Sequence, residues 1–235
     1  MTLQKNDFIE IEFAGRTPDG EIFDSNIKEV LEKLNPNYNK DQAKPFAFAL
    51  GQNMFLKGVE DYLLEKNEIG KNFTIELAPE NAFGLRQSRS VQLIPMRVFI
   101  QQKINPIQGV VFNFDGRIGK ILSVSGGRVM VDFNHPLAGK KIIYDVKVLR
   151  KIDDINEKTK SFIDFLFKRD LIFEIRDDIL FLKVEKQMKQ FIEIFKDKFK
   201  EVLNLNLHVD IIAEQTKDNL SKLAVEEQNK SQQSL

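Results

Sequence analysis

The residues of this sequence that could take part in chemistry are few, and their types exclude several kinds of site. The chain has no cysteine, which removes thiolate nucleophiles, disulfides and cysteine-based metal sites together. Its two histidines, His135 and His208, have no ligand partners nearby in the sequence, so we assign them structural roles. Asp24 follows a short apolar run, where an aspartate is as consistent with a turn as with a functional carboxylate. These residues predict neither a metal nor a cofactor.

Most of the aromatic residues are phenylalanines. The sequence contains 20 phenylalanines and no tryptophan. A phenylalanine on a strand belongs to the core in most cases, and we assign Phe8, Phe48 and Phe73 to it.

Length and charge limit the class of protein. A chain of 235 residues with 42% hydrophobic residues can bury more than one core, since domains run about 50–200 residues. Lys+Arg and Asp+Glu both number 35, so the positive field that nucleic-acid binding needs is missing. The amino terminus lacks the apolar segment of a signal peptide, and no stretch approaches the ~20 apolar residues that span a bilayer. We therefore expect a cytoplasmic protein that binds neither nucleic acid nor membranes.

The first part of the chain predicts strands around one short helix. Residues 8–13 alternate apolar and acidic residues and run into a turn composition at 17–20. Residues 45–51 and 73–77 also alternate, and between them the apolar residues of 55–64 have helical spacing. Such a mixture indicates an α+β unit.

A second pattern interrupts the first. Residues 109–114 and 117–124 flank Asp115-Gly116, a strong hairpin signal, and 128–133 supply another strand. The first unit then resumes, because 142–149 form one more apolar strand.

Beyond Arg150 the composition becomes rich in Lys and Glu. Apolar spacing predicts a helix from Ile155, a hairpin over 171–184, a second helix over 188–203 and a last strand over 205–212, which is an α-β-β-α-β order. The polar end is predicted to be disordered.

The order of several short motifs carries a resemblance. They are Asp19–Ser25, Pro45–Phe48, Leu50-Gly51, Phe55–Glu60 and Ala82–Gly84. In this order they resemble the FKBP-type peptidyl-prolyl cis-trans isomerases. The stretch Val131–Lys140 is similar to the sequence at which SlyD-type members return from their inserted chaperone domain. The resemblance covers about residues 5–151, and the full layout resembles the long archaeal members, in which a carboxy-terminal domain follows.

The resemblance implies an α+β fold with an antiparallel FKBP-type half-barrel around a short helix. It also implies an inserted small β domain and a C-terminal α-β-β-α-β domain. The implied boundaries are 1–85 and 137–151 for a discontinuous isomerase domain, 86–136 for the inserted chaperone domain, 152–216 for the C-terminal domain and 217–235 for the disordered tail.

The implied activity is isomerisation of X-Pro bonds in an apolar pocket without a nucleophile. Rotation about a peptide bond has a barrier of ~18–20 kcal/mol, and uncatalysed prolyl isomerisation takes ~10–100 s. A desolvated aromatic cup disfavours the charge-separated planar amide and so stabilises the twisted state relative to the ground state. The resemblance places in this cup the catalytic residues Asp24, Phe46, Leu56, Phe83 and Tyr144 and the substrate-binding residues Phe13, Phe23, Phe55 and Val59. In the family, the N–H at the Leu56 position binds a substrate carbonyl and the Asp24 carboxylate faces the rotating amide.

The inserted domain is expected to bind unfolded chains on an exposed apolar edge or groove. The candidate residues are Leu93, Ile94, Met96, Val98 and Phe99, together with Ile100, Ile107, Val111 and Phe114. The alternative is that they form the insert's own small core, which must claim a good half of them.

Two functions follow from these expectations. The favoured one is an isomerase and folding chaperone whose partners are unfolded or partly folded polypeptides with Pro-containing segments. The alternative is an ATP-independent holdase with little or no isomerase activity. The long archaeal relatives also imply a homodimer through the C-terminal domain.

Overall fold

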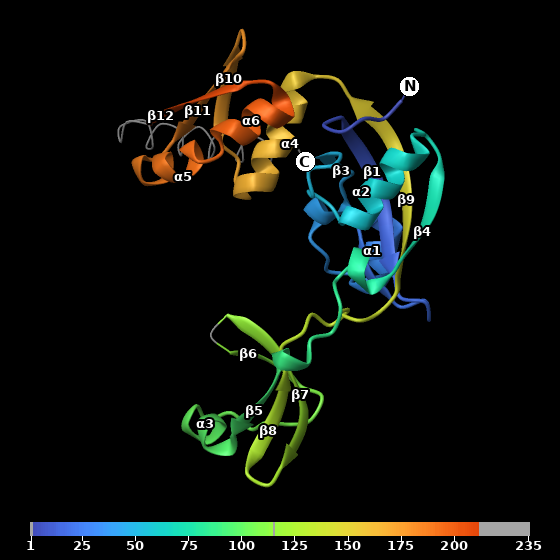
Figure 1. Ribbon diagram of the computed structural model, residues 1–235, viewed down its shortest axis with the longest axis vertical. Helices are drawn as coiled ribbons and strands as arrows, with labels where there is room; N and C mark the ends of the chain where they lie inside the picture. Colours follow the sequence, from blue (N-terminus) through green and yellow to red (C-terminus); the bar gives the residue numbers. More distant parts are fainter. Residues whose placement is uncertain (1, 115, 212–235) are drawn as a thin grey trace, which may run out of the picture.

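The alternation that begins at Phe8 produces β1 (Phe8–Arg16), the central strand of an antiparallel sheet in the computed structural model, which describes residues 2–114 and 116–211 (Figure 1). Successive side chains of a strand point to opposite faces, so Ile9, Ile11 and Phe13 are buried together on one face of β1. One edge of β1 pairs with β9 (Ile142–Ile152), and the other edge pairs with β2 (Ile22–Ser25) and β3 (Phe46–Ala49).

The sheet continues from β9 to β4 (Asn72–Leu77), and α2 (Lys57–Lys66) packs against it with Val59 and Leu63 buried. The helix ends at Asn67, which adopts a left-handed conformation. Shorter elements complete this part of the chain: α1 (Lys28–Leu34) and the 3-10 turns Lys40–Ala43, Pro79–Asn81 and Ser88–Ser90. The predicted mixture of helices with antiparallel sheets is confirmed.

The interrupting segment, here called the insert (residues 86–136), has a sheet of its own in the order β5-β8-β7-β6. Its elements are β5 (Val91–Pro95), α3 (Met96–Gln101), β6 (Val111–Phe114), β7 (Arg117–Ser125) and β8 (Arg128–Asp132). The sequence predicted the last three strands but neither β5 nor α3. Both are short, β5 ends at a proline, and α3 has no side-chain cap.

One residue that was predicted to bind unfolded chains on the surface of the insert is buried instead. Phe99 is only 1% exposed and forms the insert's core with Ile121, Val129 and Val131, so the prediction that it belongs to an exposed surface is wrong. The physical reason is that α3 turns this ring inward onto the sheet, where it meets Phe114 edge to face at 5.8 Å.

The C-terminal unit (residues 152–211) begins with α4 (Ile155–Phe167) and contains the predicted hairpin as β10 (Ile172–Arg176) and β11 (Ile179–Val184). Its last strand, β12 (Asn206–Ile211), pairs parallel to β11. A parallel pair needs a crossover, and here helical segments supply it. They are the 3-10 turn Lys186–Met188, α5 (Lys189–Glu193) and α6 (Lys196–Leu203).

The prediction of one continuous helix over 188–203 is wrong, because the helix breaks between α5 and α6. At the break, the Phe195 ring packs edge to face on Phe167 at 5.4 Å, while Phe199 packs on Phe162 at 5.1 Å. Phe195 lies between the two helices, and Phe199 of α6 also stacks on Phe167 at 6.4 Å. The predicted disordered tail lies outside the described residues.

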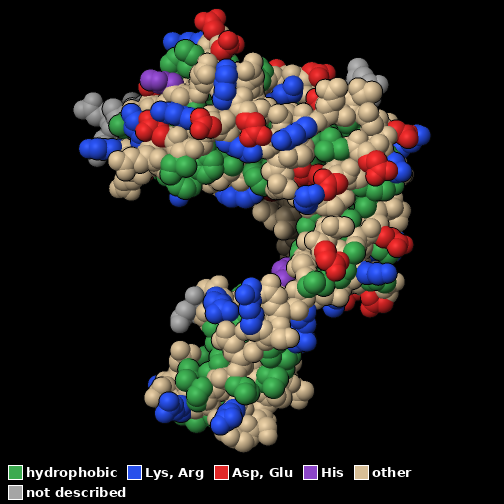
Figure 2. Space-filling view, viewed as in Figure 1, with side chains coloured by type: hydrophobic (Ala, Val, Ile, Leu, Met, Phe, Trp, Pro, Cys, Tyr) green, Lys and Arg blue, Asp and Glu red, His purple; other side chains and the backbone are tan. Residues whose placement is uncertain are grey.

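The first unit and the C-terminal unit share one hydrophobic core, whereas the insert has a separate one. Phe162 of α4 lies edge-on to Phe8 of β1 at 6.4 Å, and α4 packs along β3. Figure 1 shows the insert and the C-terminal unit at opposite ends of the first unit, and Figure 2 shows the hollow that separates them. Over residues 2–114 and 116–211, no helix combines the length and apolar character that crossing a membrane requires.

Phe162→Ala is expected to lower the free energy of unfolding by about 3–5 kcal/mol, because it removes a buried ring from the shared core. Circular dichroism during urea denaturation measures this loss. Phe191→Ala is the matched control, since its ring is 52% exposed, and should cost less than about 1 kcal/mol. Equal losses in the two variants would contradict a shared core centred on Phe162.

Candidate active site

A hydrogen bond between Tyr144 and Asp24 lies at the centre of the predicted cup. Tyr144, on β9, is 1% exposed and its Oη donates to Asp24 Oδ2 at 3.1 Å. The pairing of β1 with β9 sets Tyr144 opposite Gly15. A side chain at Gly15 would lie 2.8 Å from the Tyr144 ring and 2.9 Å from Phe23, so only glycine allows both rings to approach the strand.

The surroundings of this pair raise the pKa of both groups. Burial raises the pKa of the Asp24 carboxyl above its ordinary value, although the hydrogen bond from Tyr144 opposes the rise. The pKa of the Tyr144 hydroxyl lies well above its usual range, because burial and then the Asp24 charge both disfavour the phenolate. Tyr144 therefore remains a hydrogen-bond donor over the physiological pH range.

Phe55 is the ring that joins the rest of the cup. Its centroid lies 4.9 Å from Phe13, 5.5 Å from Tyr144, and 5.8 Å from both Phe46 and Phe48. These rings come from β1, β3, β9 and the turn before α2, so the sheet and the helix together form the cup. Tilted and edge-to-face arrangements of this kind are favourable for aromatic pairs.

The predicted cup residues differ in their access to a substrate. Phe23, Phe46, Phe55, Leu56 and Phe83 are half-buried and offer surface. Phe13 and Tyr144 are buried behind them and shape the cup from within. Val59 is 0% exposed, so the prediction that it contacts substrate is wrong: α2 turns this short side chain into the core.

Glu60 holds the turn that carries Phe55 and Leu56, a role that the sequence analysis did not assign. This carboxylate is 1% exposed and accepts hydrogen bonds from the N–H groups of Phe55 (2.7 Å), Gln52 (3.0 Å) and Asn53 (3.2 Å). Burial raises its pKa, although these N–H groups favour the charged form. The only sign of this role in the sequence is that an acidic residue follows Val59 directly, on the predicted helix.

The same turn leaves a donor available. Among the residues that the structure describes, none accepts a hydrogen bond from the Leu56 N–H, which precedes the first turn of α2. A backbone N–H at a helix start can bind a carbonyl oxygen without competition from the protein.

Phe83 connects the cup to the insert. Its ring lies 5.9 Å from Phe23 and stacks on His135 at 4.4 Å with an interplanar angle of 7°. The two connecting segments of the insert, 84–90 and 132–140, are here called the stalk. They bind each other: Arg86 donates to Asp132 at 2.7 Å, and the Gly139 N–H donates to the Gly84 carbonyl at 2.8 Å.

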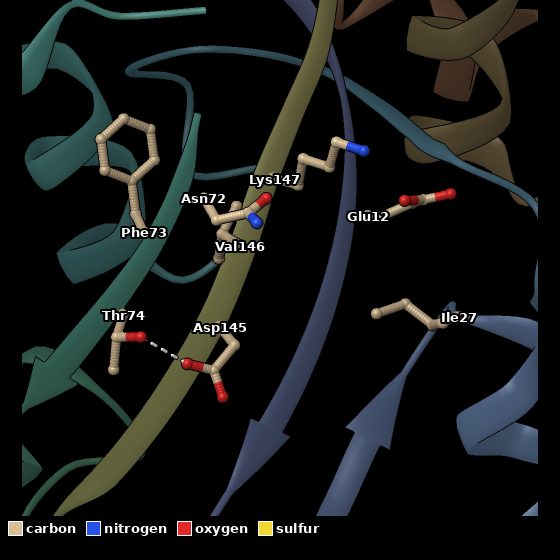
Figure 3. A pocket seen from close by; sticks show the side chains of 8 residues that line it. All are labelled: Glu12, Ile27, Asn72, Phe73, Thr74, Asp145, Val146 and Lys147. Atoms are coloured by element: carbon tan, nitrogen blue, oxygen red, sulfur yellow. Dashed lines mark hydrogen bonds between the residues drawn. The ribbon is translucent and has the colours of Figure 1, made fainter. Parts of the chain in front are cut away.

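A different cavity of about 340 Å³ lies on the other face of the sheet (Figure 3). Glu12 and Asp145 line it, and their sequence neighbours Phe13 and Tyr144 point the opposite way, into the cup. Thr74 Oγ1 donates to Asp145 Oδ1 at 2.7 Å, as the dashed line in Figure 3 shows. None of the predicted cup residues lines this cavity, and we assign it no part in the cup's chemistry.

Comparisons with known proteins give four further findings. A family model described as FKBP26, IF domain, matches residues 92–137. The short-type peptidyl-prolyl cis-trans isomerase of Methanocaldococcus jannaschii is 30% identical over 146 residues, which are 62% of this chain and 92% of that protein.

The FKBP-type peptidyl-prolyl cis-trans isomerase SlyD of Haemophilus influenzae is 29% identical over 154 residues, covering 63% of this chain and 72% of that protein. Among solved structures, the three FKBP domains of wheat FKBP73 align with 66% of this chain and 42% of that one, at 14% identity and a TM-score of 0.34.

Tyr144→Phe is expected to raise the pKa of the Asp24 carboxyl further, because it removes the donor that opposes the effect of burial. Since the folded pKa lies above the unfolded value, protonation of this carboxyl favours folding at low pH, and that contribution is lost as pH rises through the folded pKa. Carbon NMR of the carboxyl during a pH titration measures the shift.

Tyr62→Phe serves as the control, because the Tyr62 ring packs on Phe73 instead. A Tyr144→Phe variant whose Asp24 titrates at the wild-type midpoint or below it would show that the hydrogen bond does not act on this carboxyl.

Proposed function

This chain belongs to the FKBP-type peptidyl-prolyl cis-trans isomerases, and from that premise we propose that it rotates X-Pro bonds in the aromatic cup and holds unfolded chains on its insert. The observation that carries the first part is the Tyr144–Asp24 hydrogen bond, whose tyrosine ring packs on Phe55.

The reaction makes and breaks no covalent bond, so the cup needs only to favour a twisted amide over a planar one. The half-buried rings of Phe46 and Phe55 offer an apolar seat for the prolyl ring. The Leu56 N–H binds the carbonyl oxygen of the substrate, and the Asp24 carboxylate, fixed by Tyr144, faces the rotating amide. Desolvation of the amide in this seat disfavours its charge-separated planar form.

The chaperone part of the proposal rests on the insert's exposed apolar residues. Leu93 is 58% exposed, Ile100 67%, Ile107 56% and Val111 54%. Of the other candidates, Ile94, Met96 and Phe114 pack against the insert's core and Val98 is half-buried. Green patches on the insert in Figure 2 show apolar side chains at the surface. A chain held there brings its prolines to the cup at raised local concentration.

One observation favours the alternative of a holdase with little isomerase activity. The Phe55 ring packs against four other rings, so only part of its surface is available to a prolyl ring. The long archaeal layout and the homodimer through the C-terminal unit stay predictions.

Asp24→Ala and Phe46→Ala are each expected to lower kcat/KM for a Pro-containing tetrapeptide by at least about tenfold, or about 1.4 kcal/mol of transition-state stabilisation. A protease-independent fluorescence assay of cis-trans exchange measures the rate. Asp61→Ala, on the solvent side of α2, and Phe191→Ala, on α5, are the matched controls. If wild-type protein shows no turnover while it still suppresses aggregation, the holdase alternative replaces the isomerase.

The double variant Leu93→Ser/Ile100→Ser is expected to slow catalysis of a proline-limited refolding reaction about tenfold more than it slows tetrapeptide isomerisation, because it removes two exposed apolar contacts for an unfolded chain. Stopped-flow fluorescence of the refolding substrate provides the measurement. Leu34→Ser, at a position 48% exposed on α1, tests whether any surface leucine has this effect. Parallel losses on both substrates would remove the insert from client binding.

A further inference from the structure

Two neighbouring cavities between the cup and the insert share part of their lining. The first, of about 440 Å³, is bounded at one end by Phe23, Asp24 and Phe83 of the cup. The second, of about 520 Å³, reaches the side chains of Val111, Ile118 and Leu122 on β6 and β7. Glu21, His135, Pro136 and Lys140 line both cavities. The two cavities therefore join into one depression, here called the cup–insert groove.

We propose that the cup–insert groove binds the extended segment of a substrate polypeptide that adjoins the proline in the cup, so that one chain contacts the cup and the insert at the same time. This inference rests on the proposed isomerase function and deepens it. The occupant is polypeptide because the groove is continuous with the cup at Asp24 and Phe83. Its other end offers exposed apolar side chains, with Val111 54% and Ile118 55% exposed.

His135 is the central contact of the groove. One face of its ring stacks on Phe83, and Nδ1 accepts a hydrogen bond from the Leu137 N–H at 3.2 Å. A neutral imidazole whose Nδ1 accepts carries its proton on Nε2, so this nitrogen can donate to a backbone carbonyl of the substrate. Backbone recognition of this kind suits a site that accepts many sequences.

The stalk holds the groove in shape before a substrate arrives. Asn134 Oδ1 accepts from the Gln87 N–H at 2.8 Å, and Asn134 Nδ2 donates to the Gln87 carbonyl at 3.0 Å. The bond between Arg86 and Asp132 lies on the same pair of segments. A groove whose walls are already bonded together loses less conformational entropy when it binds.

The charges of the lining predict a sequence preference. Glu21 and Lys140 line both cavities, so among the described residues the unpaired charges that distinguish the two ends are Asp24 toward the cup and Lys120 toward the insert, where Arg86 and Asp132 pair with each other. Acidic side chains of the substrate should therefore be favoured several residues from the proline, on the side that runs toward the insert.

The test uses the full chain and three labelled peptides: a Pro-containing tetrapeptide, and the same peptide extended by about six residues, or about 20 Å, on its amino-terminal or its carboxy-terminal side. Fluorescence anisotropy measures affinity. The groove leaves the cup on one side only. Either the amino-terminal or the carboxy-terminal extension, but not both, should therefore raise the affinity of the peptide for the protein by about tenfold. Ile118→Ser and His135→Ala should each lose most of that gain.

Val124→Ser is the matched control, since Val124 lies on the same strand as Ile118, is 39% exposed and lines neither cavity. It should keep the gain. His135→Phe preserves a ring that can stack on Phe83 but has no Nε2–H, so a gain intermediate between wild type and His135→Ala separates stacking from hydrogen bonding.

No gain from either extension, or equal losses in Ile118→Ser and Val124→Ser, would overturn the groove. Anisotropy measures binding and does not depend on turnover. Failure of the isomerase function would appear separately, as a wild-type protein that does not accelerate cis-trans exchange of the tetrapeptide.

Discussion

The pairing of β1 with β9 is the constraint on which the rest of the structure depends. The two strands pair from Phe8 with Ile152 to Arg16 with Ile143, although the whole insert separates them in the sequence. This register puts Tyr144 beside Gly15 and so within reach of Asp24. It also requires the two ends of the insert to meet beside β4 and β9, and it leads the chain directly from β9 into α4. The cup, the stalk and the shared core all follow from one strand pair.

Within the cup, specific hydrogen-bond donors fix two carboxylates, the buried Glu60 and the more exposed Asp24. Glu60 is satisfied by three backbone N–H groups of the turn before α2, and Asp24 by the Tyr144 hydroxyl. An unsatisfied buried carboxylate would cost several kcal/mol, so Glu60 depends on these N–H groups. The first carboxylate fixes the position of Phe55 and Leu56, and the second keeps a negative charge at the wall of an aromatic site.

The parts of this arrangement that the sequence could predict are those with local signals. Alternation identified β1, β4 and β9, and the order of motifs from Asp19 to Gly84 identified the family and the rings that gather around Phe55. Elements without such signals were missed. The run Val91–Pro95 is too short to show a period, and α3 has too few residues to show an amphipathic face. The exposure of Val59 and Phe99 depends on how a helix is turned against its sheet, which spacing alone does not give. The position of His135 could not be predicted, because its stacking on Phe83 is a tertiary contact for which the neighbouring sequence gives no signal.

The separate core of the insert has a consequence for how the molecule can fluctuate and diverge. Among the residues that the structure describes, its buried members are Phe99, Ile121, Val129 and Val131, whereas a much larger cluster joins the first unit to the C-terminal unit. Local stability scales with buried apolar contact, so the insert can open and close as its own cooperative unit while the cup stays folded. The exposed apolar surface of the insert can therefore change in sequence, shape and stability without disturbing the core that the cup shares with the rest of the chain.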